Sequence, residues 1–457
     1  MTGKVIIISV LTLCLLLLFR AVKNDSLTYD ELLHVASGVE WQKVNSSQTD
    51  PFNPPLPKLP AAVISLVSPG QLSDPFLVNF RLVTASYTLG LILLVWLWTK
   101  YRFGLLAATI ASVLVAFEPT VLAHGHLFTT DMIATLVFFA LFVTFDLFQD
   151  KGQKKWLMAS YALMAILIGT KMTLIPMFGS FLVVYLLFTK KTKRNPLSIW
   201  GIAVLCLIVF VIFRGNIFEA GRIFVHDFSY VFNPKFEVTH SYMFFEQISR
   251  KGWFVYPFII LPIKLSLTLL AGLVFGLIKI KKGRWYLLLP VLVILGVVSL
   301  GRYNTGIRQL LPLFPFLAII AAVGIARLRP VFIAVILLIH VAQALFVRDY
   351  IAYFNPLVGT ERGGKIAVES NLDIGQSLPL AATEIDPSKI DFYLFNTTAS
   401  PKLYGFTGNK LEATSVVENK KVLISRTIWY TGQYFSNPRW KNRTVRLVAG
   451  ETLVLVE

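Results

Sequence analysis

The sequence predicts a polytopic α-helical membrane protein with about 11 transmembrane helices, followed by a small C-terminal α/β or α+β domain. Hydrophobic residues make up 55% of the 457 residues, whereas soluble domains contain about 45–50% apolar residues. Apolar runs that approach the roughly 20 residues needed to cross a bilayer recur until about position 347. From about Asp349 charged residues return and short β-rich runs appear, which indicates soluble structure.

The apolar runs give the candidate membrane spans in order. They cover roughly 5–22, 79–99, 104–122, 130–148, 155–169, 172–189, 197–213, 255–278, 285–300, 308–326 and 331–347. The runs at 155–169, 172–189 and 285–300 are short, and a short helix can be re-entrant or buried in protein. The two cysteines, Cys14 and Cys206, lie inside apolar runs and predict neither a disulfide framework nor a zinc site.

Lysine and arginine residues collect in alternate connections between these spans. The basic connections lie at 100–102, 151–155, 190–194, 279–284 and 327–329. With eleven spans all of them fall on one side, and the positive-inside rule makes that side cytoplasmic. The net charge of +18 therefore fits a membrane topology and does not require nucleic acid. We expect a cytoplasmic N-terminus and polar loops 28–58, 124–131, 214–253 and 302–308 outside.

Two domains follow from this organisation. Residues 1–348 are expected to form the transmembrane domain with its outer loops, and residues 349–457 a soluble extracytoplasmic domain. In the second domain β-rich runs at 389–396, 421–430 and 444–456 are separated by Gly, Pro and Asn residues. Roughly 110 residues suffice for a small independent domain.

The first outer loop is dense in reactive groups. Thr28 and Glu31 match a capping box, in which the two side chains satisfy free N–H groups at the start of a helix. If a helix begins there, Asp30 and His34 lie four residues apart and share one face. The helix dipole keeps an acid at this position ionised, which suits a base or a cation ligand. Capping alone explains Glu31 well and Asp30 hardly at all.

The same loop closes on Lys58, which follows the proline-rich stretch 53–57. A lysine on a fixed turn can contact an anionic phosphate group. A lysine at a membrane edge can equally well extend its ammonium group to water while its stem stays apolar. The sequence leaves these two interpretations of Lys58 open.

Two further outer turns carry candidate site residues. Asp131 opens a span after Thr129 and Thr130, where either a helix cap or an active-site carboxylate is expected. His124 and His126 lie within eight residues of Asp131 and could bind a divalent cation with it, although histidines two residues apart are not a standard zinc spacing.

The turn 302–308 contains Arg302, Asn304 and Arg308. Two arginines on the outer side run against the charge bias, and the guanidinium group suits recognition of phosphate. The sequence contains no Walker loop, GxSxG elbow, HExxH motif or dinucleotide fingerprint, which argues against nucleotide-driven transport and several hydrolase classes.

Taken together, these stretches resemble the GT-C membrane glycosyltransferases, specifically the protein O-mannosyltransferase and aminoarabinose-transferase group that uses polyprenyl-phosphate sugars. The segment 353–376 is similar to the tail motif of a poorly characterised bacterial branch. Two positions depart from the pattern, because Asn53 replaces a histidine and Ile374 a tryptophan. The motifs that carry the resemblance are Asp30-Glu31 with His34, Asn53-Pro54-Pro55-Leu56-Pro57-Lys58, Thr129-Thr130-Asp131, Asn304-x-Gly306-x-Arg308 and Ser370-Asn371-Leu372-Asp373-Ile374-Gly375-Gln376.

The resemblance implies a GT-C-like fold in the bacterial plasma membrane and an inverting transfer of sugar from a polyprenyl-phosphate donor to an acceptor hydroxyl. It implies that Asp30 is the catalytic base and that Lys58 and Arg308 hold the phosphate. Glu31 and Asp131 would position acceptor or sugar, or share a divalent cation; no cofactor is certain. We also expect His34, Arg302 and Asn304 in substrate binding. The acceptor could be a protein, a lipid or a glycan.

A transporter or flippase of a lipid-linked or anionic substrate is the alternative from another class. Transporters place charged residues near the middle of the bilayer in broken helices, whereas the candidates here cluster at one interface. The sequence also contains no repeat of its two halves. An inactive relative that acts as a scaffold is a third hypothesis, and the presence of Asp30, Lys58 and Arg308 together argues against it.

Overall fold

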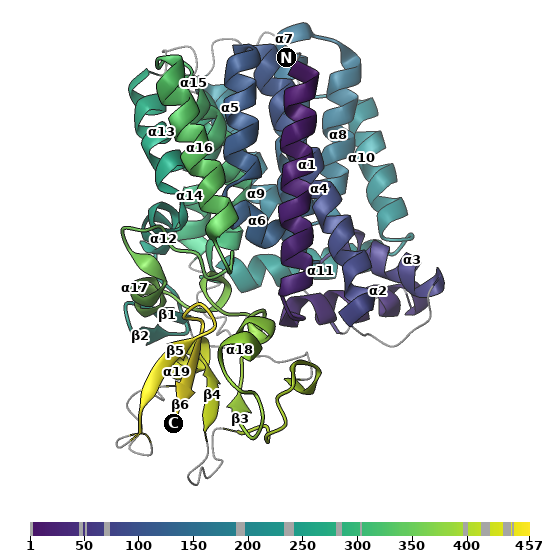
Figure 1. The fold of residues 1–457 in the computed structure, drawn as a ribbon. Helices are drawn as coiled ribbons and strands as arrows, with labels where there is room; N and C mark the ends of the chain where they lie inside the picture. Colours follow the sequence, from purple (N-terminus) through teal and green to yellow (C-terminus); the bar gives the residue numbers. More distant parts are fainter. Residues whose placement is uncertain are drawn as a thin grey trace.

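A computed structural model places the helices of the first 346 residues in a bundle, with a small β-sheet at the end opposite the N-terminus (Figure 1). The structure describes residues 3–44, 49–50, 53–67, 74–188, 197–232, 242–279, 286–301, 304–395, 401–412, 421–432, 440 and 443–457.

The bundle consists of long helices joined by short ones. Its helices are α1 (Gly3–Asn24), α2 (Tyr29–Val44), η1 (Leu56–Lys58), α3 (Leu59–Val67), α4 (Asp74–Phe103), α5 (Leu105–Ala116), α6 (Pro119–Gly125), α7 (Thr130–Lys151), α8 (Lys154–Ile168), α9 (Leu174–Phe188), α10 (Ile199–Ile212), α11 (Ile217–Phe232), α12 (Tyr256–Lys264), α13 (Leu267–Lys279), α14 (Leu288–Gly301), η3 (Ile307–Leu313), α15 (Phe314–Ile325) and α16 (Pro330–Phe346). A small antiparallel pair, β1 (Tyr242–Phe244) and β2 (Gln247–Ser249), lies between α11 and α12, where no strand was predicted.

Several predicted spans are broken. Among the described residues four helices are long and apolar enough to cross a membrane, and the number reaches seven if each bent helix pair counts as one span. The pairs α5–α6, α10–α11 and α12–α13 bend by 61°, 92° and 113°. The α5–α6 break precedes Pro119, because proline disfavours helical backbone in the residue before it. The predicted count of about eleven spans is not confirmed, and it stays a prediction.

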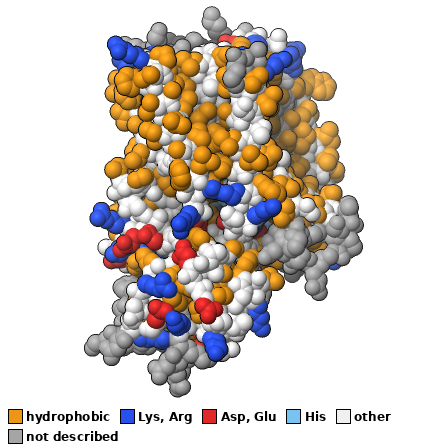
Figure 2. All heavy atoms as spheres, viewed as in Figure 1, with side chains coloured by type: hydrophobic (Ala, Val, Ile, Leu, Met, Phe, Trp, Pro, Cys, Tyr) orange, Lys and Arg blue, Asp and Glu red, His pale blue; other side chains and the backbone are white. Residues whose placement is uncertain are grey.

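Hydrophobic side chains predominate in the upper part of the face drawn in Figure 2, below a few Lys and Arg side chains at the top edge, whereas patches of charged side chains of both signs lie in its lower part. Exposed apolar residues occur along helices on the outside of the bundle; Ile8 of α1 is 61% exposed and Leu338 of α16 is 70% exposed. Water does not favour so many exposed apolar side chains, whereas lipid does. The distribution supports an integral membrane protein.

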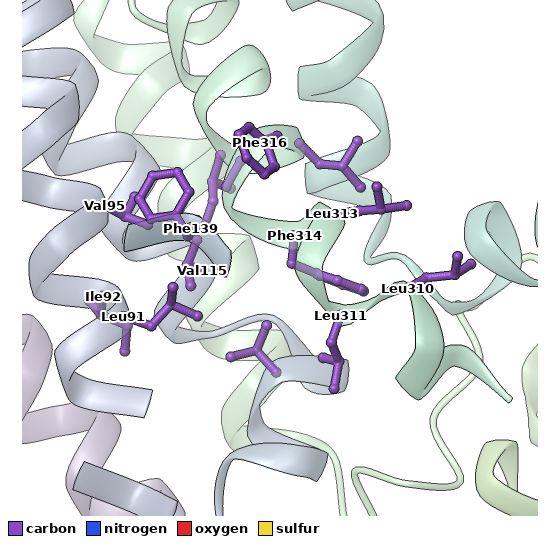
Figure 3. Close-up of a cluster of buried hydrophobic side chains, with 14 of the residues drawn as sticks. Leu91, Ile92, Val95, Val115, Phe139, Leu310, Leu311, Leu313, Phe314 and Phe316 are labelled. Carbon is purple, nitrogen blue, oxygen red and sulfur yellow. The ribbon is translucent and has the colours of Figure 1, made fainter. Parts of the chain in front are cut away.

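The core of the bundle contains interlocking aromatic and aliphatic side chains from α4, α5, α7, η3 and α15 (Figure 3). The rings of Phe139 and Phe316 meet edge-on with centroids 5.4 Å apart, an arrangement that adds stability beyond area burial. Leu310, Leu311 and Leu313 extend the same cluster into η3. The sequence predicted one helix at 308–326, but the segment starts as the 3-10 helix η3, and Pro312 and Pro315 lie around its junction with α15.

The C-terminal part combines helices with a four-stranded sheet of order β3-β4-β6-β5. β3 pairs parallel with β4, and the other two pairings are antiparallel. The predicted run 421–430 divides into a strand and helix α19, and the run 444–456 is the hairpin of β5 and β6. The elements are α17 (Gly359–Ile366), η4 (Glu369–Asn371), α18 (Leu378–Glu384), β3 (Asp391–Tyr393), η5 (Pro401–Tyr404), β4 (Val422–Ser425), α19 (Arg426–Thr431), β5 (Val445–Val448) and β6 (Leu453–Val456).

Helices α13 and α15 approach each other through glycines, as small residues allow in membrane bundles. A Cβ atom on Gly324 would lie 2.4 Å from the backbone nitrogen of Gly276, and one on Gly276 would lie 2.2 Å from the carbonyl oxygen of Ile320. Gly296 of α14 has no such neighbour within 4 Å of an added Cβ.

We therefore expect Gly324→Ala to destabilise the protein by about 1–3 kcal/mol, because the added methyl group overpacks a backbone contact. Gly296→Ala is the matched control and should be neutral or slightly stabilising, since alanine favours helix more than glycine does. Thermal unfolding of the purified chain in detergent measures both. Equal unfolding midpoints for the two variants would contradict the close approach of α13 and α15.

Candidate active site

Glu31 anchors the start of α2. Its side chain is fully buried, and Thr28 donates its backbone N–H and its hydroxyl to Oε2 at 3.1 and 3.0 Å. The first of these bonds confirms the predicted capping role of Glu31, whereas the Thr28 hydroxyl donates to the same carboxylate. The guanidinium group of Arg81 in α4 donates to both carboxylate oxygens at 2.8 and 2.7 Å, and the N–H of Phe128 donates to Oε1 at 3.0 Å.

The charge of Glu31 is stabilised by these partners. Burial alone would raise its pKa, but Arg81 and the backbone donors outweigh burial and lower the pKa to about 2. Arg81 also donates to the carbonyl oxygens of Val22, Asp25 and Ser26 at 3.0, 2.7 and 2.9 Å. The Arg81–Glu31 pair therefore fixes the turn between α1 and α2.

Asp30 directly precedes Glu31 and faces a different neighbour. Its carboxylate forms an ion pair with Arg308 of η3. The Asp30 and Arg308 side chains are 23% and 21% exposed, so a ligand can reach both partners from the protein surface. The structure thus brings together the predicted base and one predicted phosphate-binding residue, although 278 positions separate them in the chain.

Lys58 and His34 meet at a different carboxylate, that of Asp50. The Lys58 ammonium lies 2.9 Å from Asp50 Oδ2 and donates to the carbonyl oxygen of Asn53 at 2.8 Å. His34 Nδ1 lies 3.1 Å from the same Oδ2. Lys58 is only 1% exposed, and burial lowers its pKa although Asp50 opposes that shift. Asn53, which replaces the expected histidine, also donates to Asp50.

Asp131 lies at the start of α7, and Asn304 lies in the turn between α14 and η3. Asp131, in the first turn of α7, is 4% exposed and lies 2.5 Å from Lys171 Nζ, and Arg308 is near enough for its charge to act on Asp131. Asn304 accepts a hydrogen bond from the backbone N–H of Trp253 at 2.5 Å. Arg302, the remaining predicted residue, lies outside the described residues.

Sequence reasoning missed the partners of these side chains. Arg81 and Lys171 interrupt or separate apolar runs, and a lone cation in such a place is a usable signal. The sequence spacing around Asp50 does not identify it as the partner of Lys58 and His34, since that role depends on how the loop folds. Among the residues that the structure describes, no group of three His, Cys, Asp or Glu side chains could hold a metal ion. His126 instead lies 2.8 Å from Asp25.

Residues 70–214 match the family model of dolichyl-phosphate-mannose-protein mannosyltransferases. A 111-residue stretch, 24% of the chain, is 35% identical to the "Putative mannosyltransferase YkcB" of Bacillus subtilis (strain 168) and spans 15% of the length of that relative.

The whole chain is similar in structure to ArnT from Cupriavidus metallidurans bound to undecaprenyl phosphate. The TM-score is 0.61 at 16% identity, over 100% of this chain and 98% of ArnT. The chain therefore has the GT-C fold of ArnT. The Archaeoglobus fulgidus oligosaccharyltransferase in its apo form is similar with a TM-score of 0.50 at 13% identity, over 76% of this chain and 55% of that one. The predicted resemblance to the GT-C group is confirmed.

The Glu31–Arg81 pair predicts an acid-dependent loss of stability. Because the pKa of Glu31 in the folded chain lies below its ordinary value of 4.5, its contribution is complete above pH 4.5 and lost as the pH falls towards 2. A shift of this size corresponds to about 3 kcal/mol. At pH 7 Glu31→Gln should also cost about 3–5 kcal/mol, because Arg81 stays buried without its partner.

The measurement is the thermal unfolding midpoint in detergent between pH 7 and 3. The wild-type midpoint should fall more steeply than that of Glu31→Gln. Glu361→Gln, which removes one exposed carboxylate, should follow the wild type. Parallel curves for wild type and Glu31→Gln would refute this account of the pair.

Proposed function

We propose that this chain is an inverting membrane glycosyltransferase that moves a sugar from a polyprenyl-phosphate donor to an acceptor hydroxyl on the extracytoplasmic face. The observation that carries the proposal is the part-exposed Asp30–Arg308 pair. The pair joins a carboxylate suited to take a proton with a guanidinium suited to hold a phosphate. The GT-C fold and the lipid phosphate bound by ArnT in its structure support the donor class.

The proposed reaction is a single displacement. The oxygen of the acceptor hydroxyl bonds to the anomeric carbon, and the bond from that carbon to the phosphate oxygen breaks. Asp30 takes the proton of the hydroxyl, and the phosphate leaves with the bonding electrons while Arg308 stabilises its charge. One displacement inverts the anomeric centre.

Donor binding would prepare the base. In the structure Arg308 is engaged by Asp30. A donor phosphate that binds the guanidinium competes with Asp30 for it, and this competition frees the carboxylate to face the acceptor. Binding of the donor phosphate at Arg308 would therefore precede proton removal by Asp30.

We propose supporting roles for the other candidates. Lys58 would contact the phosphate only after its ion pair with Asp50 breaks. The Asp50 carboxylate would then keep its contact with His34. Asp131 and Lys171, near Arg308, would contact sugar or acceptor. Asn304 holds the loop that precedes Arg308 through its bond to Trp253. Glu31 would contribute through its anchoring of the helix that carries Asp30.

To test the proposed reaction, purified protein is incubated with a radiolabelled polyprenyl-phosphate hexose and with membrane extract as the source of acceptors. Transfer of the label to the acceptor is measured. Asp30→Asn should lower transfer about 10²–10⁴-fold, as expected for loss of a general base. Asp386→Asn, a change at an exposed carboxylate, should leave transfer unchanged. Unchanged transfer by Asp30→Asn would remove the base assignment, and no transfer by wild type from any lipid-linked sugar would favour the transporter hypothesis.

A binding measurement tests the phosphate site separately. Arg308→Gln should weaken binding of undecaprenyl phosphate roughly 10- to 100-fold, the expected loss of a charged hydrogen bond. Arg348→Gln is the control, because the Arg348 side chain is 75% exposed. Quenching of tryptophan fluorescence in detergent gives both dissociation constants. Equal affinities for the two variants would exclude Arg308 as the phosphate-binding residue.

A further inference from the structure

The segment 369–377 connects the two sides of the candidate active site. The N–H of Ser26, in the turn before α2, donates to the carbonyl oxygen of Gln376 at 2.9 Å. The N–H of Ile307, directly before Arg308, donates to Asn371 Oδ1 at 2.9 Å. An added Cβ on Gly306 would lie 2.9 Å from Ser370 Cβ, so this loop lies directly against η4. The N–H of Tyr29 also donates to the carbonyl oxygen of Ile374 at 3.4 Å, so the segment contacts the backbone beside both Asp30 and Arg308.

Glu369 begins η4 in an unusual backbone conformation. Its φ is +58°, in the left-handed region that residues other than glycine rarely adopt. Its backbone N–H donates to the hydroxyl of Thr427 at 3.0 Å. Strained backbone that the surrounding structure maintains is concentrated at functional sites.

Glu369 lies close to the Asp30–Arg308 pair, because its own 3-10 helix η4 packs against the loop before Arg308. The residue is 7% exposed, and among the described residues its carboxyl group has no direct hydrogen-bond or ion-pair partner. The charges of Arg308 and Asp30 both act on it. Of the other elements around it, α12 contributes Tyr256, whose hydroxyl accepts from Asn371, and the buried ammonium of Lys264, which donates to the carbonyl oxygen of Asn371 at 2.8 Å. Helix α19 contributes the neutral Thr427.

The protonation of this carboxyl group follows from its surroundings. Burial raises the pKa of Glu369 to about 8, because the opposing attraction of Arg308 is smaller and the charge of Asp30 adds to the effect of burial. The group is therefore mostly neutral at pH 7 and becomes anionic above pH 8. Its charge changes within the range in which enzymes are assayed.

We propose that Glu369 is a positioning residue that controls how strongly Arg308 holds an anion. A neutral Glu369 leaves the guanidinium to Asp30 and to the incoming phosphate. An ionised Glu369 adds a second carboxylate beside Arg308, which competes with the phosphate and repels it. The inference rests on the proposed function, because it takes Arg308 as the cation that binds the donor phosphate.

The test measures binding of undecaprenyl phosphate to the full chain in detergent from pH 7.5 to 9.5, by tryptophan fluorescence. The second ionisation of a phosphate monoester lies near pH 6, so the probe keeps its charge over this range. The wild-type dissociation constant should rise about fivefold or more, the usual size of such a coupling. For Glu369→Gln it should stay constant, and Glu369→Asp should restore the rise. Glu361→Gln, an exposed change on α17, should follow the wild type.

The outcomes separate the inference from the function on which it rests. If Arg308→Gln binds undecaprenyl phosphate at pH 7.5 as tightly as wild type, the phosphate site and the inference both fail. If binding depends on Arg308 but Glu369→Gln keeps the wild-type rise, the assignment to Glu369 alone is overturned. Should Glu369→Gln fail to fold, the wild-type curve still decides, because a constant wild-type affinity from pH 7.5 to 9.5 overturns the proposal.

Discussion

The buried Arg81–Glu31 ion pair is the constraint on which the candidate site depends. Burying two charges costs several kcal/mol of desolvation per ion, which only good geometry offsets. Here five hydrogen bonds reach the Glu31 carboxylate, and three carbonyl oxygens accept from Arg81. Together these bonds join α1, α2, α4 and the loop before α7 at one point. Successive residues of a helix point about 100° apart, so the same anchor directs Asp30 to a different side.

Arg308 is held in place by different means. The leucines that follow it in η3 lie in the hydrophobic core, and Asn371 and Ser370 contact the backbone just before it. The guanidinium group thus extends from a fixed base towards Asp30. A site with rigid support on both sides can hold its reacting groups in position with little loss of entropy on binding.

Much of the candidate site could be predicted from the sequence, because the signals were local. The capping box identified the helix start at Thr28, and the arginine at 308 stood out against the charge bias. The partners could not be predicted in the same way. The ion pairs of Lys58 with Asp50 and of Asp131 with Lys171 depend on how the folded chain brings their segments together. The helix breaks before Pro119 and at Ser266 were also missed, since apolar composition continues across them.

Three candidate cations are each engaged by a carboxylate, and burial distinguishes them. The Lys58–Asp50 pair is almost fully buried, with side chains 1% and 0% exposed, and in Lys171–Asp131 only the lysine is part exposed. In Arg308–Asp30 both partners are part exposed. Separating a buried pair leaves an uncompensated charge and costs about 3–5 kcal/mol, whereas water lowers this cost for an exposed pair. Under the proposed function, a donor phosphate should therefore exchange with Asp30 at Arg308 before it reaches Lys58. In that reaction the Asp30–Arg308 pair is where binding of the donor and release of the base can be the same event.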